Sequence, residues 1–230
     1  MHPSDPASVQ ARVAAVRARV EAACGRAGRD PASVTLIAVS KTQPVASIVE
    51  AAAAGITDFG ENYAQEAFAK LEDADIARLP LNWHFIGHLQ SNKTPAVARR
   101  FPWIHTIDSE RQLAAVARVA ADARLRLRLL LQVNTSGEVT KGGVAEDALA
   151  ELVRLARTFV SLELAGLMTI PAPCSDPEAS RPAFRRLCAL AEAHGLASLS
   201  MGMTGDFEVA IEEGATHIRV GRAIFGERPR

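Results

Sequence analysis

Lys41 stands at the end of Val34–Ser40, an apolar run rich in residues that favour β-strands. An amine at the end of a strand, partly removed from water and near other cationic groups, can attack an aldehyde and form a Schiff base. Taken alone this pattern is weak, because a lysine after a strand is more often a solvated charge. The residues that follow the other strands therefore decide how Lys41 is interpreted.

Glycine-containing segments follow the last two predicted strands. Ser200–Asp206 carries two glycines, two hydroxyl groups and a helix start, and Val220–Ala223 carries Gly221. Glycines let a ligand approach the backbone, and the N–H groups at a helix start favour phosphate. Tight turns at barrel corners are the competing interpretation, but both segments have this composition. Arg219 has apolar neighbours, which indicates an inward side chain aimed at a bound ligand.

Strand and helix patterns that would position these residues alternate along the chain. Valines at helical spacing predict an N-terminal helix over about residues 6–28, beginning at Asp5 and Pro6. Eight strand-like runs follow: 34–41, 56–59, 83–86, 103–107, 127–133, 162–168, 196–200 and 216–220. We therefore expect one α/β domain over residues 1–230, a single (β/α)8 TIM barrel over about 34–226 with an extra N-terminal helix. In such a barrel all the strand ends meet at one mouth, and the loops after strands seven and eight bind phosphate.

Composition limits the class of protein. Of the 230 residues 48% are hydrophobic, and 26 Lys and Arg balance 26 Asp and Glu. The balance gives no basic field for nucleic acid and no acidic excess typical of disorder. Three separated cysteines with no CxxC pair argue against a disulfide framework or a zinc knuckle. No apolar run approaches the ~18–20 residues of a membrane span, and we expect a cytoplasmic protein.

A Schiff-base lysine, two phosphate-type loops and an inward arginine together predict a site for pyridoxal 5′-phosphate (PLP). Five segments, matching in order between about Val34 and Gly226, resemble the pyridoxal phosphate homeostasis protein family, the single-domain relatives of the alanine racemase barrel, whose fold is a type III PLP-binding barrel. The segments are 38–42, 58–63, 83–93, 200–206 and 219–226. The third is the most specific, because no generic structural requirement accounts for its eleven consecutive residues.

The resemblance implies roles for particular residues. Lys41 would hold the cofactor as an internal aldimine, Arg219 would face the pyridine nitrogen, and Asn62 and His84 would line the pocket. The residues implied around the phosphate are Ser200, Met203, Thr204, Gly221 and Arg222, the last two mainly through backbone N–H groups.

Two positions depart from the family pattern. Thr204 stands where serine is frequent, which keeps the hydroxyl, and Arg222 stands where threonine is usual, which puts a side-chain contact with the phosphate in doubt. Lys141 matches a lysine that the family usually carries, and we expect a secondary cofactor contact there.

The favoured function is a carrier that buffers PLP, maintains vitamin B6 and amino-acid homeostasis, and turns over little substrate. An arginine at the pyridine nitrogen disfavours its protonation and so weakens the cofactor as an electron sink, which suits a carrier or a racemase that must limit side reactions. We expect a monomer that hands PLP to apo-enzymes. The alternative is an amino-acid racemase or lyase with Lys41 as base and Tyr63 or His84 as the second acid. A third possibility is a phosphate-binding barrel without PLP, in which Lys41 binds a carboxylate.

Other residues have competing interpretations. His84 and His88 have a spacing that would suit zinc on a helix, but the segment between them is predicted as strand and loop. Asp58 and Glu61 are candidates for acid–base chemistry, although carboxylates after strands more often orient lysines or cap helices. Cys174 has no neighbouring base, and we interpret it as an ordinary exposed thiol.

Overall fold

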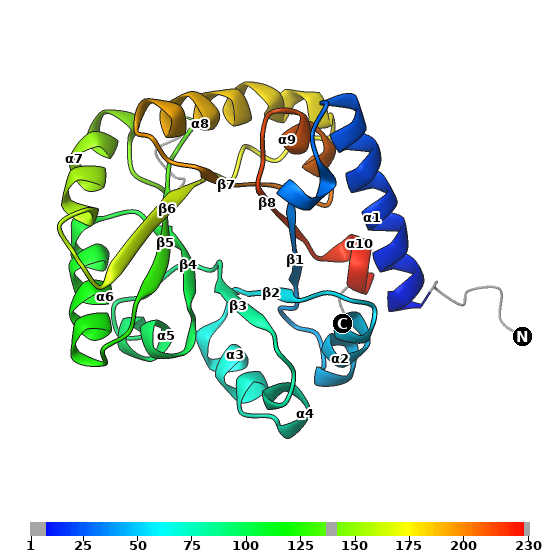
Figure 1. Cartoon of the computed structure of the whole chain (residues 1–230), viewed down its shortest axis with the longest axis horizontal. Coiled ribbons are helices and arrows are strands. Elements are labelled where there is room, and N and C mark those ends of the chain that lie inside the picture. Colours follow the sequence, from blue (N-terminus) through cyan, green and yellow to red (C-terminus); the bar gives the residue numbers. More distant parts are fainter. Residues whose placement is uncertain (1–7, 137–141, 228–230) are drawn as a thin grey trace, which may run out of the picture.

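The computed structural model describes residues 8–136 and 142–227. Within these residues, eight parallel strands pair in chain order and close into a barrel, with β8 next to β1 (Figure 1). The strands are β1 (Thr35–Val39), β2 (Asp58–Glu61), β3 (Asn82–Phe85), β4 (Trp103–Ile107), β5 (Leu127–Gln132), β6 (Leu162–Met168), β7 (Ser198–Met203) and β8 (His217–Val220). The predicted (β/α)8 barrel is confirmed.

The helices surround the barrel (Figure 1). They are α1 (Val9–Arg26), α2 (Val45–Ala53), α3 (Ala64–Leu71), α4 (Ala74–Ala77), α5 (Thr94–Arg100), α6 (Glu110–Asp122), α7 (Glu146–Ala156), α8 (Arg181–Ala193), α9 (Phe207–Glu212) and α10 (Arg222–Phe225). The extra N-terminal helix α1 contacts α9 and α10. It therefore covers the outside of the barrel where β8 meets β1. None of the helices in the described part of the chain is long and apolar enough to cross a membrane.

Some boundaries differ from those predicted from the sequence. Helix α1 begins at Val9, because the side chain of Ser8 accepts a hydrogen bond from the N–H of Ala11 (3.2 Å) and caps the helix. Asp5 and Pro6, the predicted start, lie outside the described residues. Strand β7 continues to Met203, past its predicted end at Ser200. The short helices α4 and α5 were not predicted, because four to seven residues hold too little periodic pattern to identify a helix.

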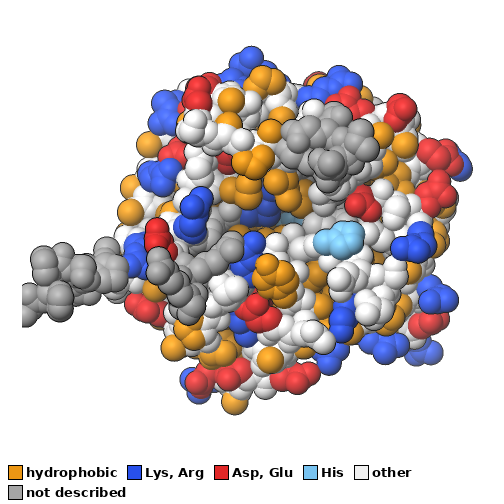
Figure 2. Space-filling view, turned by 180° about the vertical axis from the view of Figure 1, so that it is seen from behind, with side chains coloured by type: hydrophobic (Ala, Val, Ile, Leu, Met, Phe, Trp, Pro, Cys, Tyr) orange, Lys and Arg blue, Asp and Glu red, His pale blue; other side chains and the backbone are white. Residues whose placement is uncertain are grey.

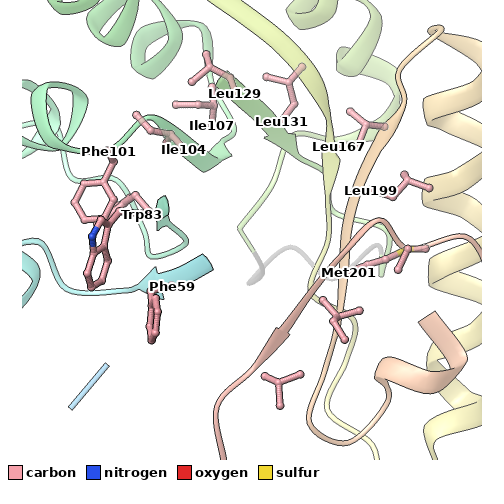
Figure 3. Close-up of a cluster of buried hydrophobic side chains, with 14 of the residues drawn as sticks. Phe59, Trp83, Phe101, Ile104, Ile107, Leu129, Leu131, Leu167, Leu199 and Met201 are labelled. Carbon is pink, nitrogen blue, oxygen red and sulfur yellow. The ribbon is translucent and has the colours of Figure 1, made fainter. Parts of the chain in front are cut away.

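The hydrophobic core lies between the barrel and its helices. Figure 3 shows part of it, where Phe59, Ile104 and Leu131 come from three different strands. Phe59 and Trp83 pack with their ring centroids 5.6 Å apart. Truncating a fully buried aromatic such as Phe59 to alanine removes about 3–5 kcal/mol of stability.

The interior of the barrel is unusually polar. Successive side chains of a strand point to opposite faces, so the neighbours of the core residues point inward. The inward side chains include Asp58, His84, Trp103, His105, Ser200, His217 and Arg219. Gly60 leaves space for two aliphatic side chains beside them, because a Cβ there would lie 2.8 Å from Ile86 Cδ1 and 2.9 Å from Ile37 Cγ2. Branched aliphatic residues usually fill this space in barrels of this type, so the polar interior indicates a functional constraint.

Candidate functional site

Lys41 lies in the turn that follows β1, at the mouth of the barrel, and is partly buried. The turn is tight: the N–H of Gln43 donates to the carbonyl of Ser40 (3.0 Å), and Thr42 has a φ of 64°. A left-handed conformation is rare for a residue with a branched Cβ, and such strain persists only where surrounding contacts enforce it. The position of Lys41 is therefore fixed by neighbouring structure.

A buried ion-pair cluster supplies those contacts. Lys70 Nζ on α3 donates to the carbonyl of Ser40 (2.7 Å) and pairs with Glu61 Oε1 (2.7 Å) and Glu66 Oε1 (2.6 Å). Glu66 Oε1 also accepts from the N–H of Thr42. Burial raises the pKa of the Glu61 carboxyl, although the charge and hydrogen bond of Lys70 oppose the shift. Glu61 therefore orients a lysine, as the simpler of its two sequence interpretations predicted.

The loop after β8 approaches the Lys41 turn through strand pairing. Ala38 pairs with Val220, so a Cβ on Gly221 would lie 3.4 Å from the carbonyl oxygen of Val39. Arg222 begins α10, and the first N–H groups of a helix have no partner inside it. These donors therefore lie close to the strand end that carries Lys41.

The loop after β7 is held in shape by Asp206. Its carboxylate accepts from the N–H of Met203 (2.7 Å) and from the hydroxyl of Ser180 (2.9 Å). Gly202 has a φ of 85°, and a Cβ there would lie 2.5 Å from the Cβ of Ala210. Glycine is thus required for α9 to approach β7. Thr204 is half-buried and Met203 is 39% exposed.

Arg219 projects into the barrel from β8 and is 4% exposed. One guanidinium nitrogen donates to Ser200 Oγ (2.7 Å) and another to the carbonyl of Thr169 (2.9 Å). Burial lowers the pKa of Arg219 to about 10, which still leaves it charged at neutral pH. The predicted inward orientation of Arg219 is confirmed.

The structure separates the predicted site residues into two levels. Lys41, Thr204, Gly221 and Arg222 lie in the loops at the mouth. The side chains of Ser200, His84 and Arg219 lie deeper, inside the barrel, where the Ser200 hydroxyl contacts Arg219 rather than the loops. Figure 2 shows the mouth side of the molecule, with basic side chains and a histidine near its middle beside a group of hydrophobic side chains.

Asn62 lies at the end of β2, and its buried Oδ1 has no hydrogen-bond partner among the described residues. It lines a cleft of about 280 Å³ together with Tyr63, Gly87, His88 and Lys93. Gly87 is required here, because a Cβ would lie 1.9 Å from the carbonyl oxygen of Asn62. His84 points into the barrel whereas His88 is exposed, so the two do not form a pair. Lys141 lies outside the described residues.

Sequence reasoning missed the imidazole cluster formed by His84, His105 and His217. Their ring centroids lie 5.1–6.3 Å apart. Burial lowers the pKa of all three, of His217 to about 4, and the charge of Arg219 adds to the effect at His105 and His217. All three rings are therefore neutral at pH 7. The available signal was the alternation of Trp103 and His105 with apolar residues in β4.

Comparison with known proteins gives consistent results. The family model for the alanine racemase N-terminal domain matches residues 12–229. The pyridoxal phosphate homeostasis protein of Pseudomonas aeruginosa is 47% identical over 223 residues, covering 96% of each chain. The structure of PipY from Synechococcus elongatus with PLP bound is 35% identical, with a TM-score of 0.80 over 95% of this chain and 100% of that one.

The fold extends to larger enzymes. Alanine racemase from Streptomyces coelicolor is 21% identical, with a TM-score of 0.71 over 94% of this chain but only 59% of that one. The matches to the homeostasis proteins, by contrast, run nearly end to end in both chains. The chain therefore belongs to the pyridoxal phosphate homeostasis protein family, whose barrel is the fold of the alanine racemase N-terminal domain.

Proposed function

We propose that this protein binds PLP at the mouth of the barrel, covalently through Lys41, and serves as a PLP carrier. The observation that carries the proposal is the pairing of β1 with β8, which brings the strand end bearing Lys41 beside the loop at Gly221. An amine and a set of N–H donors suited to phosphate thus lie close enough together for one small molecule to contact both. The PLP-bound PipY structure, at 35% identity, supports the same ligand.

The donors present fit the chemistry of PLP. Backbone N–H groups at Gly221 and Arg222, the hydroxyl of Thr204 and the charge of Arg222 suit a phosphate dianion. Arg219 supplies a buried cation below the mouth, where the pyridine nitrogen is expected. The unpartnered Oδ1 of Asn62 is an acceptor for a donor that the protein itself does not provide. Ser200 contributes to this site through Arg219, to which its hydroxyl is bonded.

The chain's own contribution to the covalent link is the amine of Lys41. Lys41 would hold PLP as a Schiff base between its Nζ and the aldehyde, a bond whose formation releases one water and whose hydrolysis consumes one. Because hydrolysis reverses the step with no other reactant, the protein can release what it holds. This reversibility suits the delivery of PLP to apo-enzymes.

The position of Arg219 favours storage of the cofactor over catalysis with it. PLP, when bound with a protonated pyridine nitrogen, stabilises carbanions by drawing electrons into its ring. A guanidinium cannot accept a proton, so Arg219 at this nitrogen keeps it unprotonated and the electron sink weak. Tyr63, the phenol considered as a second acid, is 53% exposed at the end of β2. We therefore favour the carrier over the racemase or lyase.

A spectroscopic titration tests the proposal. Adding PLP to the apo-protein should produce an absorbance band distinct from that of free PLP, and Lys41→Ala should remove the band while leaving weaker, phosphate-anchored binding. Lys93→Ala, which removes another partly buried lysine near the mouth, is the matched control and should keep the band. A band of full intensity in Lys41→Ala would refute the role of Lys41. No PLP binding by the wild type would refute the function itself.

A further inference from the structure

A chain of hydrogen bonds crosses the inside of the barrel, below the proposed site. It links the Arg219 guanidinium to Ser200 Oγ (2.7 Å) and Ser200 Oγ to His105 Nδ1 (2.9 Å). It then links His105 Nε2 to His84 Nδ1 (3.0 Å) and His84 Nε2 to Asp58 Oδ1 (3.0 Å). This hydrogen-bonded chain connects five strands, β8, β7, β4, β3 and β2, through side chains alone.

The chemistry of its two ends fixes the direction of every hydrogen bond. A guanidinium only donates, so Ser200 Oγ accepts from Arg219 and turns its own hydrogen toward His105 Nδ1. His105 therefore carries its hydrogen on Nε2 and donates to His84 Nδ1. His84 in turn carries its hydrogen on Nε2 and donates to Asp58, which as a carboxylate only accepts. Both tautomers follow from this one argument.

Burial keeps the middle of the chain uncharged. Ser200 and His105 are 0% exposed and His84 is 1% exposed. The lowered pKa values of His84 and His105 agree with neutral rings, which the one-way arrangement requires. A hydrogen-bonded chain in a dry interior polarises along its length, so each bond strengthens the next.

Asp58, the last residue of the hydrogen-bonded chain, is partly exposed to solvent. The Asp58 side chain is 16% exposed and begins β2, at the end of the barrel opposite the mouth. It lines a groove of about 350 Å³ together with Arg17, Thr35 and Thr57. Hydrogen bonds from His84 and Thr57 lower the pKa of Asp58 in spite of its burial, so it remains ionised. A fixed negative charge thus anchors the chain at the N-terminal rim.

We propose that His105 and His84 are positioning residues: through Ser200, the chain anchored on Asp58 fixes the direction of the Arg219 guanidinium toward the cofactor. The carbonyl of Thr169 holds one nitrogen of Arg219, and Ser200 holds the other. Without His105 the Ser200 hydroxyl loses the acceptor that keeps its lone pair turned to Arg219. The part of the proposal that concerns the cofactor rests on the proposed function.

The first test is nitrogen-15 NMR of the imidazole rings in the apo-protein, which needs no PLP. His105 and His84 should both be neutral Nε2–H tautomers at pH 7. Ser200→Ala should shift the nitrogen-15 resonance of His105 Nδ1, which loses its donor, while His84 Nδ1 still keeps the hydrogen of His105 on Nε2. An Nδ1–H tautomer at His84 or His105 in the wild type would overturn the chain.

The second test measures PLP in the holo-protein. His105→Phe removes the acceptor of the Ser200 hydroxyl and so loosens the hydrogen bond between Ser200 and the charged Arg219, which should weaken PLP binding about tenfold and shift the absorbance of the bound cofactor. His217→Asn is the matched control, because His217 contacts both rings but bonds to Thr216 Oγ1 (2.8 Å), outside the chain. It should leave both readouts unchanged. Equal effects of the two variants would overturn the positioning role.

Two further variants keep the test decisive if His105→Phe folds poorly. Asp58→Asn retains an acceptor for His84 Nε2 and should preserve the absorbance, whereas Asp58→Ala should change it as Ser200→Ala does. Identical spectra for the two Asp58 variants would refute the anchoring role of this residue. If the wild type itself bound no PLP, the proposed function would be refuted. The NMR measurement of the His84 and His105 tautomers would still test the hydrogen-bonded chain independently.

Discussion

Replacing Lys70 with methionine should destabilise the protein strongly and in a pH-dependent manner. Lys70 Nζ makes three contacts of 2.6–2.7 Å, to Ser40, Glu61 and Glu66, and its side chain is 8% exposed. Methionine keeps the apolar stem and removes only the charge and its donors. Since Glu61 is 0% exposed, the substitution leaves a buried carboxylate unpaired, which destabilises proteins by about 3–5 kcal/mol.

The pH dependence follows from Glu61. Its pKa is already raised by burial, and removing Lys70 takes away the two largest opposing effects, so the pKa rises further in the variant. An acid with a raised folded-state pKa binds more protons folded than unfolded, so folding stability falls as pH rises above its unfolded pKa near 4.5. The loss caused by Lys70→Met should therefore be larger at pH 8 than at pH 5.5.

Urea denaturation of the wild type and variant at both pH values measures this directly. The double variant Lys70→Met/Glu61→Gln should recover at least half of the loss at pH 8, because it removes the unpaired charge. A loss under about 1 kcal/mol at pH 8, an equal loss at both pH values, or no recovery in the double variant would refute the reasoning. Lys70→Met should also weaken PLP binding, since Lys70 donates a hydrogen bond to the carbonyl of Ser40, the residue before Lys41.

Three other predictions concern different parts of the barrel. The pKa of His217 is about 4 in the folded protein and 6.5 in the unfolded chain, so His217 should lower the wild-type free energy of unfolding by ~3 kcal/mol between pH 6.5 and 4. In urea titrations at acidic pH, the free energy of unfolding of His217→Asn should fall less steeply. Gly87→Ala should lower the melting temperature sharply, because its Cβ would overlap the backbone of Asn62, whereas Gly205→Ala, with open space around it, should not. Alpha-proton exchange assayed on several amino acids with the holo-protein should be near background, and turnover of several per second would contradict the carrier role.

Much of the fold could be predicted from the sequence because its signals are local. The run ending at Lys41 and the valines at helical spacing in α1 each identify an element without reference to the rest of the chain. The end of β7 was placed too early because Gly202 usually marks a turn. Here it lies inside the strand, at an irregularity in the pairing with β8.

The candidate site could be proposed from the sequence where its residues follow strands, but not where they lie inside the barrel. Lys41 and Gly221 are recognisable because loops at a barrel mouth carry function. His105 was not, since its importance comes from Ser200, 95 residues away along the chain. Lys70 likewise looks like a solvated helical lysine until the closed barrel brings its Nζ to the Lys41 turn.

The central claim is that Lys41 forms the covalent link to PLP, and chemical trapping tests it most directly. Borohydride reduction of the PLP-loaded protein converts the C=N bond into a stable amine, and peptide mass spectrometry then locates the added group. The sequence has only four lysines, Lys41, Lys70, Lys93 and Lys141, so the assignment is unambiguous. We predict one phosphopyridoxyl group per chain on Lys41. A modification found mainly on another lysine, or none at saturating PLP, would contradict the account.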